Sequence, residues 1–354
     1  PDEEVRQGAV VPGFVNSHCH IELSHLHGKF HKGTGMAGFI DQINALRDWA
    51  GADVKARLTQ EWMDKMWKDG VSAMSDISND DSSFKVKSSH KIYTRTFLEV
   101  FGSEPEMCEG VMSDVTKLKE TADAEGIDAA PTPHSCYTMS PQLLSASAAA
   151  GLESGYLSYH SQESQEEEDL LISGSGAMYE NRKRSGMSTP PVTGESSLKY
   201  FIDRLAAAKP APYDEHILLV HNVCLKQDDI DAAKRVMNNV YWAVCPLSNI
   251  FIHNALPPIP LMRKNGLAIT VGTDSLSSND DLDMVKELVC IKQNFAEVPM
   301  NEILVWACLN GARFLSKEDT LGSIAPGKTP GIVFVSNVDE EGSFTADSRS
   351  ERLV

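Results

Sequence analysis

The sequence lacks long apolar runs and clustered cysteines. No stretch approaches the ~20 apolar residues that span a bilayer, and the opening segment PDEEVRQGAV has neither the basic nor the apolar region of a signal peptide. The seven cysteines are scattered, without CxxC spacing and without the density of a disulfide scaffold. These absences argue against a membrane-spanning or disulfide-stapled protein, so we expect a cytoplasmic chain with mostly buried thiols.

The sequence also has fewer basic residues than acidic ones. The 354 residues include 32 Lys and Arg against 50 Asp and Glu, which gives a formal net charge of -18. Such a surface repels the phosphates of nucleic acids and of anionic lipids. We therefore expect a small-molecule ligand, no nucleic-acid partner and no membrane partner. No pattern encodes the oligomeric state, and a homodimer is expected only as the common default for enzymes.

Short apolar segments alternate with helical patterns along the chain. Helices are predicted where apolar residues share a face, as do Phe39, Ile40 and Ile43, and where Ser140 and Pro141 form an N-cap and first-turn pair. This alternation predicts parallel strands, either closed in a barrel or doubly wound. The eight candidate strands span residues 10–20, 71–78, 90–100, 128–135, 155–163, 216–224, 241–249 and 267–275.

Polar residues at the ends of these segments decide between the two folds. In a (β/α)8 barrel the carboxyl ends of all strands meet at one mouth, whereas an open sheet spreads them along an edge. We therefore predict an α/β protein with a (β/α)8 barrel, because that fold brings the polar groups within reach of one ion. The groups are His18 and His20, Asp76, His134, His160 and Glu163, His221, Ser248 and Asn249, and Asp274.

His18 and His20 are the first candidate metal ligands. Because they are two residues apart on an extended segment, both imidazoles leave the same face and can meet one cation. An isolated HxH pair also arises by chance or as a surface pair. Here Pro12, Gly13 and FVN, which has the pattern of a buried segment, precede it, which places the pair at a strand end.

His160 and Glu163 form the next candidate pair. In a regular strand they would face opposite ways, so the strand should end near Ser161 and turn Glu163 toward the mouth. The alternative for Glu163 is a solvated acidic cluster, because the charge run SQESQEEED continues past it. The acids of residues 166–169 are interpreted as simple helix N-terminal acids.

His221 and Asp274 each follow an apolar run, ILLV and ITVGT. A polar side chain in that place is an unusual core filler, although each alone can be a hydrogen-bonded core residue. With the HxH pair and His160 they supply imidazole and carboxylate ligands, for which zinc is favoured and iron is the alternative. The fourth candidate strand, DAAPTPHS, has no Lys to bridge two metals, so a single divalent ion is predicted.

These residue types predict a separate catalytic role for each residue of the site. Zinc held by the HxH pair, His160 and Asp274 would lower the pKa of a bound water to roughly 7. His221 would orient the hydroxide, and Asp274 would accept the water's proton. Glu163 would protonate a ring nitrogen and then the departing amine, which otherwise leaves as a costly amide ion. This is the chemistry that a hydrolytic deaminase needs.

Several motifs resemble the amidohydrolase superfamily, specifically its deaminase and chlorohydrolase branch. PGFVNSHCHIELS resembles the first-strand signature, and PHSCYTMSP, HSQE, LLVHNV, CPLSN and VGTDSLSSNDDLDM follow in that branch's order. LNGARFL and LGSIAPGK resemble its closing helix and its return to a small β domain. The branch includes adenosylhomocysteine/methylthioadenosine, guanine and aminodeoxyfutalosine deaminases. The resemblance covers roughly residues 10–335.

The resemblance implies a distorted (β/α)8 TIM barrel over residues 10–318. Residues 1–9 and 319–354 are expected to be remnants of a small β-sandwich domain formed from the chain ends. Relatives begin with several strands that are almost missing here, and GKTPG stands where they read Gly-Lys-x-Ala-Asp. The small domain is therefore expected to be incomplete, and the site is unaffected.

The resemblance also implies roles for individual residues. His134, in PHSCYT, matches a substrate-contacting histidine, and its alternative is a strand-end residue bonded to a loop carbonyl. Arg95 lies on the third strand, where some relatives contact their substrate. Glu163 becomes the proton shuttle and His221 the partner of the metal-bound water. The implied ligands of the one divalent ion are His18, His20, His160 and Asp274.

Two further segments have open interpretations. Residues 173–197 are rich in Gly, Ser and Pro, and form either a mobile lid or a plain solvated loop. IELSHLHGKFHKGTG resembles the aminodeoxyfutalosine deaminase end of the branch more than the methylthioadenosine end. Its His25, His27 and His31 either contact substrate or lie in a polar loop.

Three functions follow from these patterns. The favoured one is metal-dependent hydrolytic removal of an amino group from a purine-like or other nitrogenous heterocycle. The second is hydrolysis of another carbon–nitrogen or carbon–chlorine bond by an amidohydrolase or chlorohydrolase. The third is a non-catalytic barrel, which is disfavoured because all the expected ligands are present.

Overall fold

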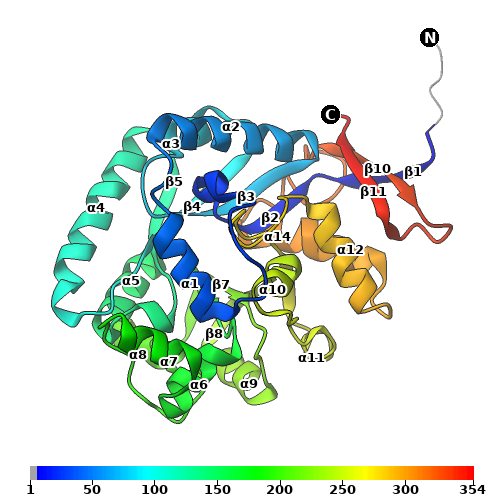
Figure 1. The fold of residues 1–354 in the computed structure, drawn as a ribbon. Helices are drawn as coiled ribbons and strands as arrows, with labels where there is room; N and C mark the ends of the chain where they lie inside the picture. Colours follow the sequence, from blue (N-terminus) through cyan, green and yellow to red (C-terminus); the bar gives the residue numbers. More distant parts are fainter. Residues whose placement is uncertain (1–5) are drawn as a thin grey trace.

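Eight parallel strands form the centre of the molecule, and helices surround them (Figure 1). The computed structural model describes residues 6–354. The strands make two four-stranded sheets, in the order β2-β3-β4-β5 and β6-β7-β8-β9. Their bounds are β2 Phe14–Cys19, β3 Val71–Ser78, β4 Tyr93–Val100, β5 Asp128–Pro133, β6 Tyr156–Ser161, β7 Tyr213–His221, β8 Met237–Val244 and β9 Ala268–Val271. All eight candidate strands of the sequence are present.

Two seams join the sheets into a barrel. At one seam, the carbonyl of His18 accepts hydrogen bonds from the backbone N–H groups of Thr273, at 3.1 Å, and Asp274, at 3.0 Å. At the other seam, the N–H of His160 donates to the carbonyl of His134 at 3.0 Å. Both seams therefore close at the carboxyl ends of the strands, among residues predicted to form the site.

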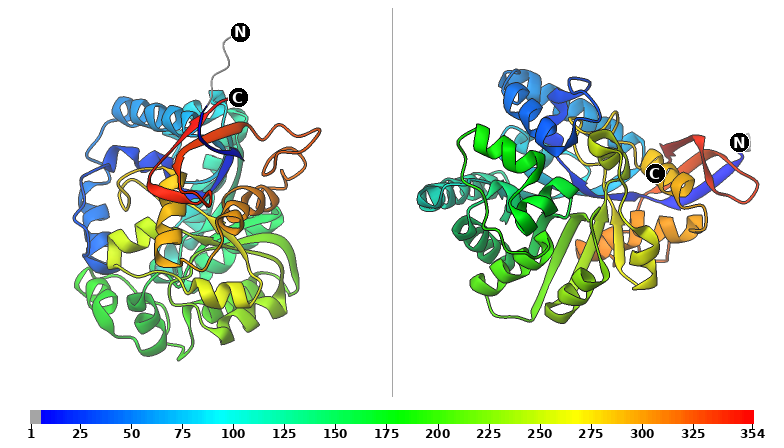
Figure 2. Two further views of the ribbon diagram at one scale, coloured as in Figure 1. Left: turned by 90° about the vertical axis from the view of Figure 1, so that its right-hand side faces the viewer. Right: turned by 60° about the horizontal axis from the view of Figure 1, so that its bottom comes forward.

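Helices cover the outside of the barrel (Figures 1 and 2). The helices are α1 Gly35–Leu46, α2 Ala52–Lys68, α3 Phe84–Ser89, α4 Cys108–Ala124, α5 Pro141–Glu153, α6 Gln165–Ser173, α7 Gly176–Arg184, α8 Ser197–Ala208, α9 Gln227–Val236, α10 Pro246–His253, α11 Ile259–Lys264, α12 Met284–Asn294, α13 Met300–Leu304 and α14 Gly311–Phe314. Short turns of other helix types are η1 Ile21–Leu26, η2 Pro105–Met107, η3 Cys136–Thr138 and η4 Val305–Asn310. Ser140 caps α5 as predicted, because its hydroxyl accepts from the N–H of Leu143 at 3.3 Å.

The chain ends form a separate antiparallel sheet beside the barrel (Figure 2, left). Its order is β1-β10-β11, with β1 at Gly8–Pro12, β10 at Ile332–Val338 and β11 at Phe344–Arg352. The run 10–20, expected as one strand, is divided at Gly13, where a Cβ would collide with Ser72 and the carbonyl of Pro330. The strand at residue 331 thus pairs with β1 and β11 outside the barrel. Residues 1–5 of the predicted 1–9 remnant lie outside the described residues.

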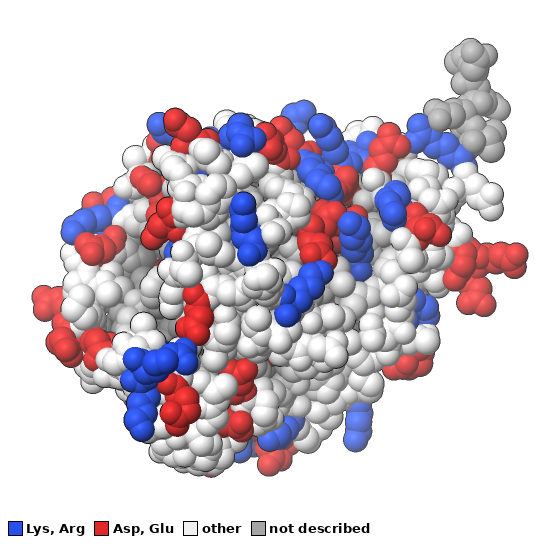
Figure 3. All heavy atoms as spheres, in the orientation of Figure 1, with Lys and Arg blue, Asp and Glu red and all other residues white. Residues whose placement is uncertain are grey.

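The surface and the remaining segments complete the fold. Lys and Arg are interspersed with Asp and Glu over the face shown in Figure 3.

None of the seven cysteines forms a disulfide in the described chain, and five are buried. No helix within residues 6–354 combines the length and apolarity needed to cross a bilayer. The segment 173–197 contains α7, whose Asn181 donates to Asp41 on α1 at 2.8 Å, followed by an irregular and mostly exposed stretch, so the lid and the solvated loop both stay open for it.

Candidate active site

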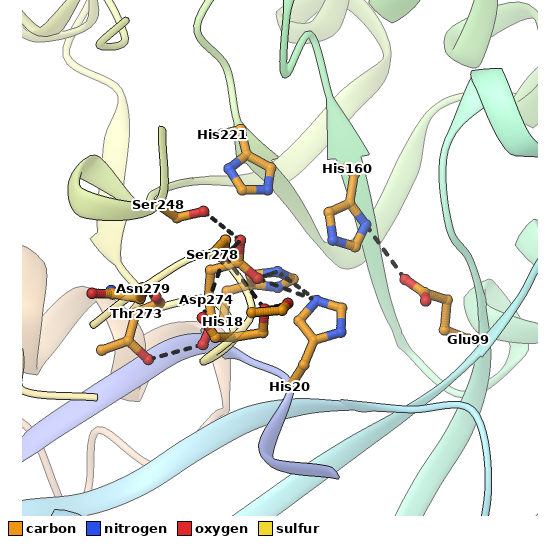
Figure 4. Close-up of polar contacts among 12 residues, drawn as sticks. His18, His20, Glu99, His160, His221, Ser248, Thr273, Asp274, Ser278 and Asn279 are labelled. Atoms are coloured by element: carbon orange, nitrogen blue, oxygen red, sulfur yellow. Dashed lines mark hydrogen bonds and ion pairs between the residues drawn. The ribbon is translucent and has the colours of Figure 1, made fainter. Parts of the chain in front are cut away.

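The predicted metal ligands meet at the carboxyl ends of the barrel strands (Figure 4). The Nε2 atoms of His18 and His20, on and just after β2, lie 3.1 Å apart. Asp274, just after β9, places Oδ1 3.7 Å from His18 Nε2 and 3.5 Å from His20 Nε2. All three side chains are buried. Two imidazoles and a carboxylate thus converge on one point.

The histidines of β6 and β7 complete this cluster. The rings of His160 and His221 have centroids 4.8 Å and 5.7 Å from that of His18. The potential ligand atoms of these three residues lie within 4.8 Å of one another, as do those of His18, His20 and Asp274. His18 Nδ1 and His221 Nε2 are buried without a hydrogen-bond partner in the described chain. A buried polar atom without a partner is costly, so the cluster fits a bound cation and water.

Burial sets the charge of the cluster. It is the main cause that lowers the pKa of His18 and His20 well below the usual range and that of His160 to about 3, aided by the neighbouring imidazoles. For Asp274 burial acts to raise the pKa, but His221, His18 and a hydrogen bond from Ser248 outweigh it, and the pKa is lowered. At neutral pH the donor set is three neutral imidazoles and one carboxylate, which suits zinc or iron.

Neighbouring polar groups fix the backbone that carries these ligands. Asp76 on β3 accepts from the N–H of Ile21 at 2.8 Å, directly after His20. Lys87 on α3 forms a buried ion pair with the same carboxylate. Asp76 was predicted as one of the strand-end polar groups, and the structure places it behind the HxH pair.

Glu163 lies beside the cluster, as the sequence predicted from a turn after β6. Its Oε1 is 3.4 Å from His221 Nε2, and its Oε2 accepts from the hydroxyl of Tyr137 at 2.8 Å. Gln162 precedes it with φ of 50°, in the left-handed region, which makes the turn. Burial, with the charge of Asp274, raises the pKa of Glu163 to about 8, so the carboxyl holds a proton at neutral pH.

The acids after Glu163 are not simple helix N-terminal acids, which corrects the interpretation from sequence. Glu166 accepts from the N–H groups of Met36 and Ala37 in α1, at 3.1 Å and 2.9 Å. Glu167 is fully buried and accepts from the N–H groups of Gln162 at 3.1 Å and Glu163 at 2.7 Å. Glu168 accepts from the N–H of Ser197 at 3.1 Å, at the start of α8. Three successive glutamates therefore accept backbone hydrogen bonds from three different segments: α1, the turn after β6, and the start of α8.

His134 lines the pocket at the mouth, where it was predicted. Its Nδ1 is bonded to the hydroxyls of Thr138 at 2.7 Å and Ser135 at 2.8 Å, which fixes the ring. Its Nε2 lies 4.0 Å from Glu99 Oε1. The alternative of a histidine bonded to a loop carbonyl does not match these partners.

Arg95 is not brought to the pocket, and we correct that expectation. It is the third residue of β4, in the half of the strand remote from the mouth, where it pairs with Asp128 at the start of β5. Its guanidinium also donates to Ser154 at 2.9 Å and stacks 4.4 Å from the centroid of the Tyr156 ring. All of these partners belong to the opposite end of the barrel, which explains the difference.

The histidines of the loop after β2 do not line the pocket in the described structure either. His25 is buried, with its ring nitrogens bonded to the carbonyls of Glu22 at 3.1 Å and Arg47 at 2.7 Å. His27 is bonded to the carbonyl of Asp280 at 3.0 Å, and His31 is exposed.

The rest of the pocket comes from residues that sequence reasoning did not assign. One side is apolar and is formed by η1 and α1. A polar part of the lining contains Arg47, at the end of α1, with Asn79 and Glu99. A charged residue inside the apolar run TFLEV was the available signal for Glu99, the same signal that identified His221 and Asp274. The apolar residues are Leu23, Met36, Phe39, Ile40 and Ile43.

A comparison with known families agrees with this geometry. The model described as "Amidohydrolase family" matches residues 9–352. The chain belongs to the amidohydrolase family. The superfamily predicted from the motifs is thereby confirmed, as are the distorted TIM barrel with a small extra sheet and the assignment of a hydrolase acting on carbon–nitrogen bonds.

Individual relatives in the amidohydrolase family resemble the chain over most of its length. An adenosine deaminase of Helicobacter pylori is 27% identical over 316 residues, which cover 87% of this chain and 73% of that protein. A crystal structure of Helicobacter pylori aminofutalosine deaminase in complex with methylthio-coformycin has a TM-score of 0.80 at 23% identity, covering 93% of this chain and 79% of that one. An adenosine deaminase from Xanthomonas campestris with bound zinc has a TM-score of 0.71 at 20% identity, covering 92% and 72%. At these identities the two structures show the shared fold.

Proposed function

We propose that this chain is a metal-dependent hydrolytic deaminase that removes an exocyclic amino group from a purine-like heterocycle. The observation that carries the proposal is the position of Glu163. Its carboxyl is buried, holds a proton at neutral pH, and lies 3.4 Å from His221 at the edge of the histidine cluster. Ring protonation and amine departure both need a proton donor at that place. The deaminase names of the relatives support the same reaction.

His18, His20, His160 and Asp274 are the residues that would hold the metal. Bound there, a divalent ion supplies Lewis acidity that makes a water nucleophilic at neutral pH. Asp274 Oδ2 already accepts hydrogen bonds from Ser248 at 2.6 Å and Ser278 at 2.8 Å, so Oδ1 is the oxygen left to face the ion. Zinc is proposed over iron because imidazole and carboxylate suit it and because a relative in fold carries it.

His221 orients the attacking water in this proposal. Its Nδ1 is paired with the side-chain amide of Asn249 at 3.1 Å, which fixes the ring. Its Nε2 is the partnerless atom, and it is the one that faces Glu163. A water in contact with both His221 Nε2 and the Glu163 carboxyl would have a hydrogen-bond partner in each.

Glu163 moves the proton. With its Oε2 held by the Tyr137 hydroxyl, Oε1 is free to donate to a ring nitrogen of the substrate. Asp274 accepts one proton of the attacking water, and the Glu163 carboxylate accepts the other from the new C–OH group and delivers it to the departing amine. The amine leaves as ammonia as the carbonyl forms, and the proton held by Asp274 returns to Glu163, so both carboxyls regain their starting protonation states.

The test is ammonia release by metal-replete protein across aminated nucleosides and bases, with elemental analysis of the same sample. Release from at least one purine compound, with about one equivalent of zinc, is expected. Bound metal without ammonia from any compound would overturn the deaminase proposal. Gel filtration of the sample tests the homodimer, which stays a prediction, as does the cytoplasmic location.

A further inference from the structure

Glu99 is a buried acid in the pocket to which the proposed mechanism gives no role. It is the next-to-last residue of β4 and lines the same pocket as Glu163 and Asp274. Only 7% of it is exposed. Figure 4 shows its carboxyl pointing from β4 toward His160.

One half of the Glu99 carboxyl is held firmly. The side-chain amide of Asn79 donates to Oε2 at 3.1 Å and to the Glu99 carbonyl at 3.0 Å. Asn79 is itself fixed, because its Oδ1 accepts from Arg47 at 2.6 Å and its N–H donates to Glu22 at 3.1 Å and 3.0 Å. The carboxyl therefore has one preferred orientation.

The other half of the carboxyl accepts no hydrogen bond within the described residues. Oε1 is buried and receives no hydrogen bond from any group that the structure describes. His160 Nδ1 lies 3.4 Å from this oxygen and His134 Nε2 lies 4.0 Å from it. His160 Nδ1 already has an acceptor, the carbonyl of His134 at 3.2 Å, so Glu99 is not needed to orient the ring. A buried oxygen that accepts no hydrogen bond is energetically costly, and a ligand group that donates to it can recover that cost.

We propose that Glu99 determines specificity by binding a hydroxyl group on the substituent of the heterocycle. A hydroxyl both donates and accepts, so it pairs with Glu99 in either protonation state. The inference rests on the proposed function and narrows its substrate class to hydroxylated heterocycles of nucleoside type, with free bases excluded. A site that hydrogen-bonds a substrate hydroxyl discriminates strongly against analogues that lack it.

Equilibrium binding tests this proposal separately from turnover. The probes are adenosine, its three monodeoxy derivatives and adenine, titrated by calorimetry into zinc-loaded Glu163→Gln protein, which prevents turnover. Adenosine is expected to bind about 10- to 100-fold more tightly than at least one monodeoxy derivative. Adding Glu99→Leu should reduce that ratio to about 1, whereas Glu99→Gln, whose amide still pairs with a hydroxyl, should keep most of it.

Each outcome has a defined meaning. Equal affinity for adenosine and all three monodeoxy derivatives, with Glu99 intact, overturns the proposal whether or not the variants fold. An unchanged ratio in Glu99→Leu, or an equal loss for every probe including adenine, also overturns it. If the protein binds adenosine more tightly than a monodeoxy derivative but the wild type releases no ammonia, the role of Glu99 stands and the deaminase function is wrong. If the wild type releases ammonia but binds all these probes equally, the deaminase function stands and the role of Glu99 is wrong.

Discussion

The pocket has a polar wall and an apolar wall, and the two differ in how firmly hydrogen bonds hold their side chains. The inner wall contains three of the metal-ligand candidates, His20, His160 and Asp274, together with Glu163, all buried on or next to barrel strands. The outer wall is the apolar set of η1 and α1, and several of its side chains, including Ile40 and Ile43, are only partly buried. Every inner-wall group is oriented by hydrogen bonds or by its cluster neighbours. The outer wall offers shape and apolar surface, so we expect the chemistry to depend on the first wall and affinity on the second.

The largest expected effect comes from removing an inner-wall ligand. His20→Ala should abolish zinc binding and reduce ammonia release to background, because one of the converging Nε2 atoms is lost. Elemental analysis and an ammonia assay measure both. His31→Ala is the matched control, since that histidine is exposed and outside the pocket. Full activity in His20→Ala would remove the cluster from the mechanism.

Replacing the proton donor should have the next largest effect. Glu163→Gln keeps the shape and the contact with Tyr137 but has no proton to move, so kcat should fall by about 10²- to 10⁴-fold. The zinc content should be unchanged, which separates this variant from His20→Ala. Glu195→Gln, on the exposed surface, serves as control. Loss of zinc together with activity would mean that Glu163 supports the metal site instead.

The outer wall should respond differently. Ile43→Ala removes apolar surface from the pocket, so KM should rise by about 5- to 30-fold while kcat and zinc content stay unchanged. Ile324→Ala, at a residue that is 52% exposed and not in the pocket, is the control. A fall in kcat equal to that of Glu163→Gln would break the distinction between the two walls.

The smallest expected effect concerns the support behind the inner wall. Glu287 on α12 is buried and accepts from the N–H of Leu247 at 3.0 Å and from the amide of Asn279 at 2.8 Å. Burial raises its pKa from 4.5 to about 8. The native state therefore keeps this proton to a higher pH than the unfolded state does. The stability it contributes is complete below pH ~4.5 and is lost as pH rises through about 8.

Thermal unfolding of the metal-free protein between pH 6 and 8.5 measures this contribution. Tm should fall with rising pH, because Glu287 lowers the free energy of unfolding by at most about 1.4 kcal/mol for each pH unit. Glu287→Gln should make the fall of Tm with pH less steep, by roughly 2 °C per pH unit. Glu61→Gln on the exposed face of α2 should leave the slope unchanged. A steeper slope in Glu287→Gln would reverse the sign and contradict the assignment.

The inner wall could be predicted from sequence because its signals are local. An HxH pair and a polar residue directly after an apolar run place a side chain at the carboxyl end of a strand, and the barrel brings those ends together. The outer wall could not be assigned in this way. The periodicity of Phe39, Ile40 and Ile43 predicted the helix, but a face that lines a pocket has the same pattern as one that packs on a core.

Two errors have physical causes of the same kind. Arg95 and Glu99 both lie on β4, and only the position along the strand separates the end with the pocket from the end with Asp128. A strand read from sequence gives alternation between faces but not depth in a barrel. Likewise, the charge run after Glu163 has the composition of a solvated helix start. Its burial depends on which backbone N–H groups the fold brings within reach of each carboxylate.

The first turn of α6 forms hydrogen bonds with both walls of the pocket. Glu166 holds the start of α1, which carries most of the outer wall, and Glu167, the next residue, holds the backbone of Glu163 on the inner wall. Two adjacent side chains on one helical turn therefore connect the two walls. An insertion or deletion at this turn would displace one wall relative to the other, whereas lengthening the loop before α8 would not. For protein engineering, this turn is the place to adjust how large a substrate the pocket admits.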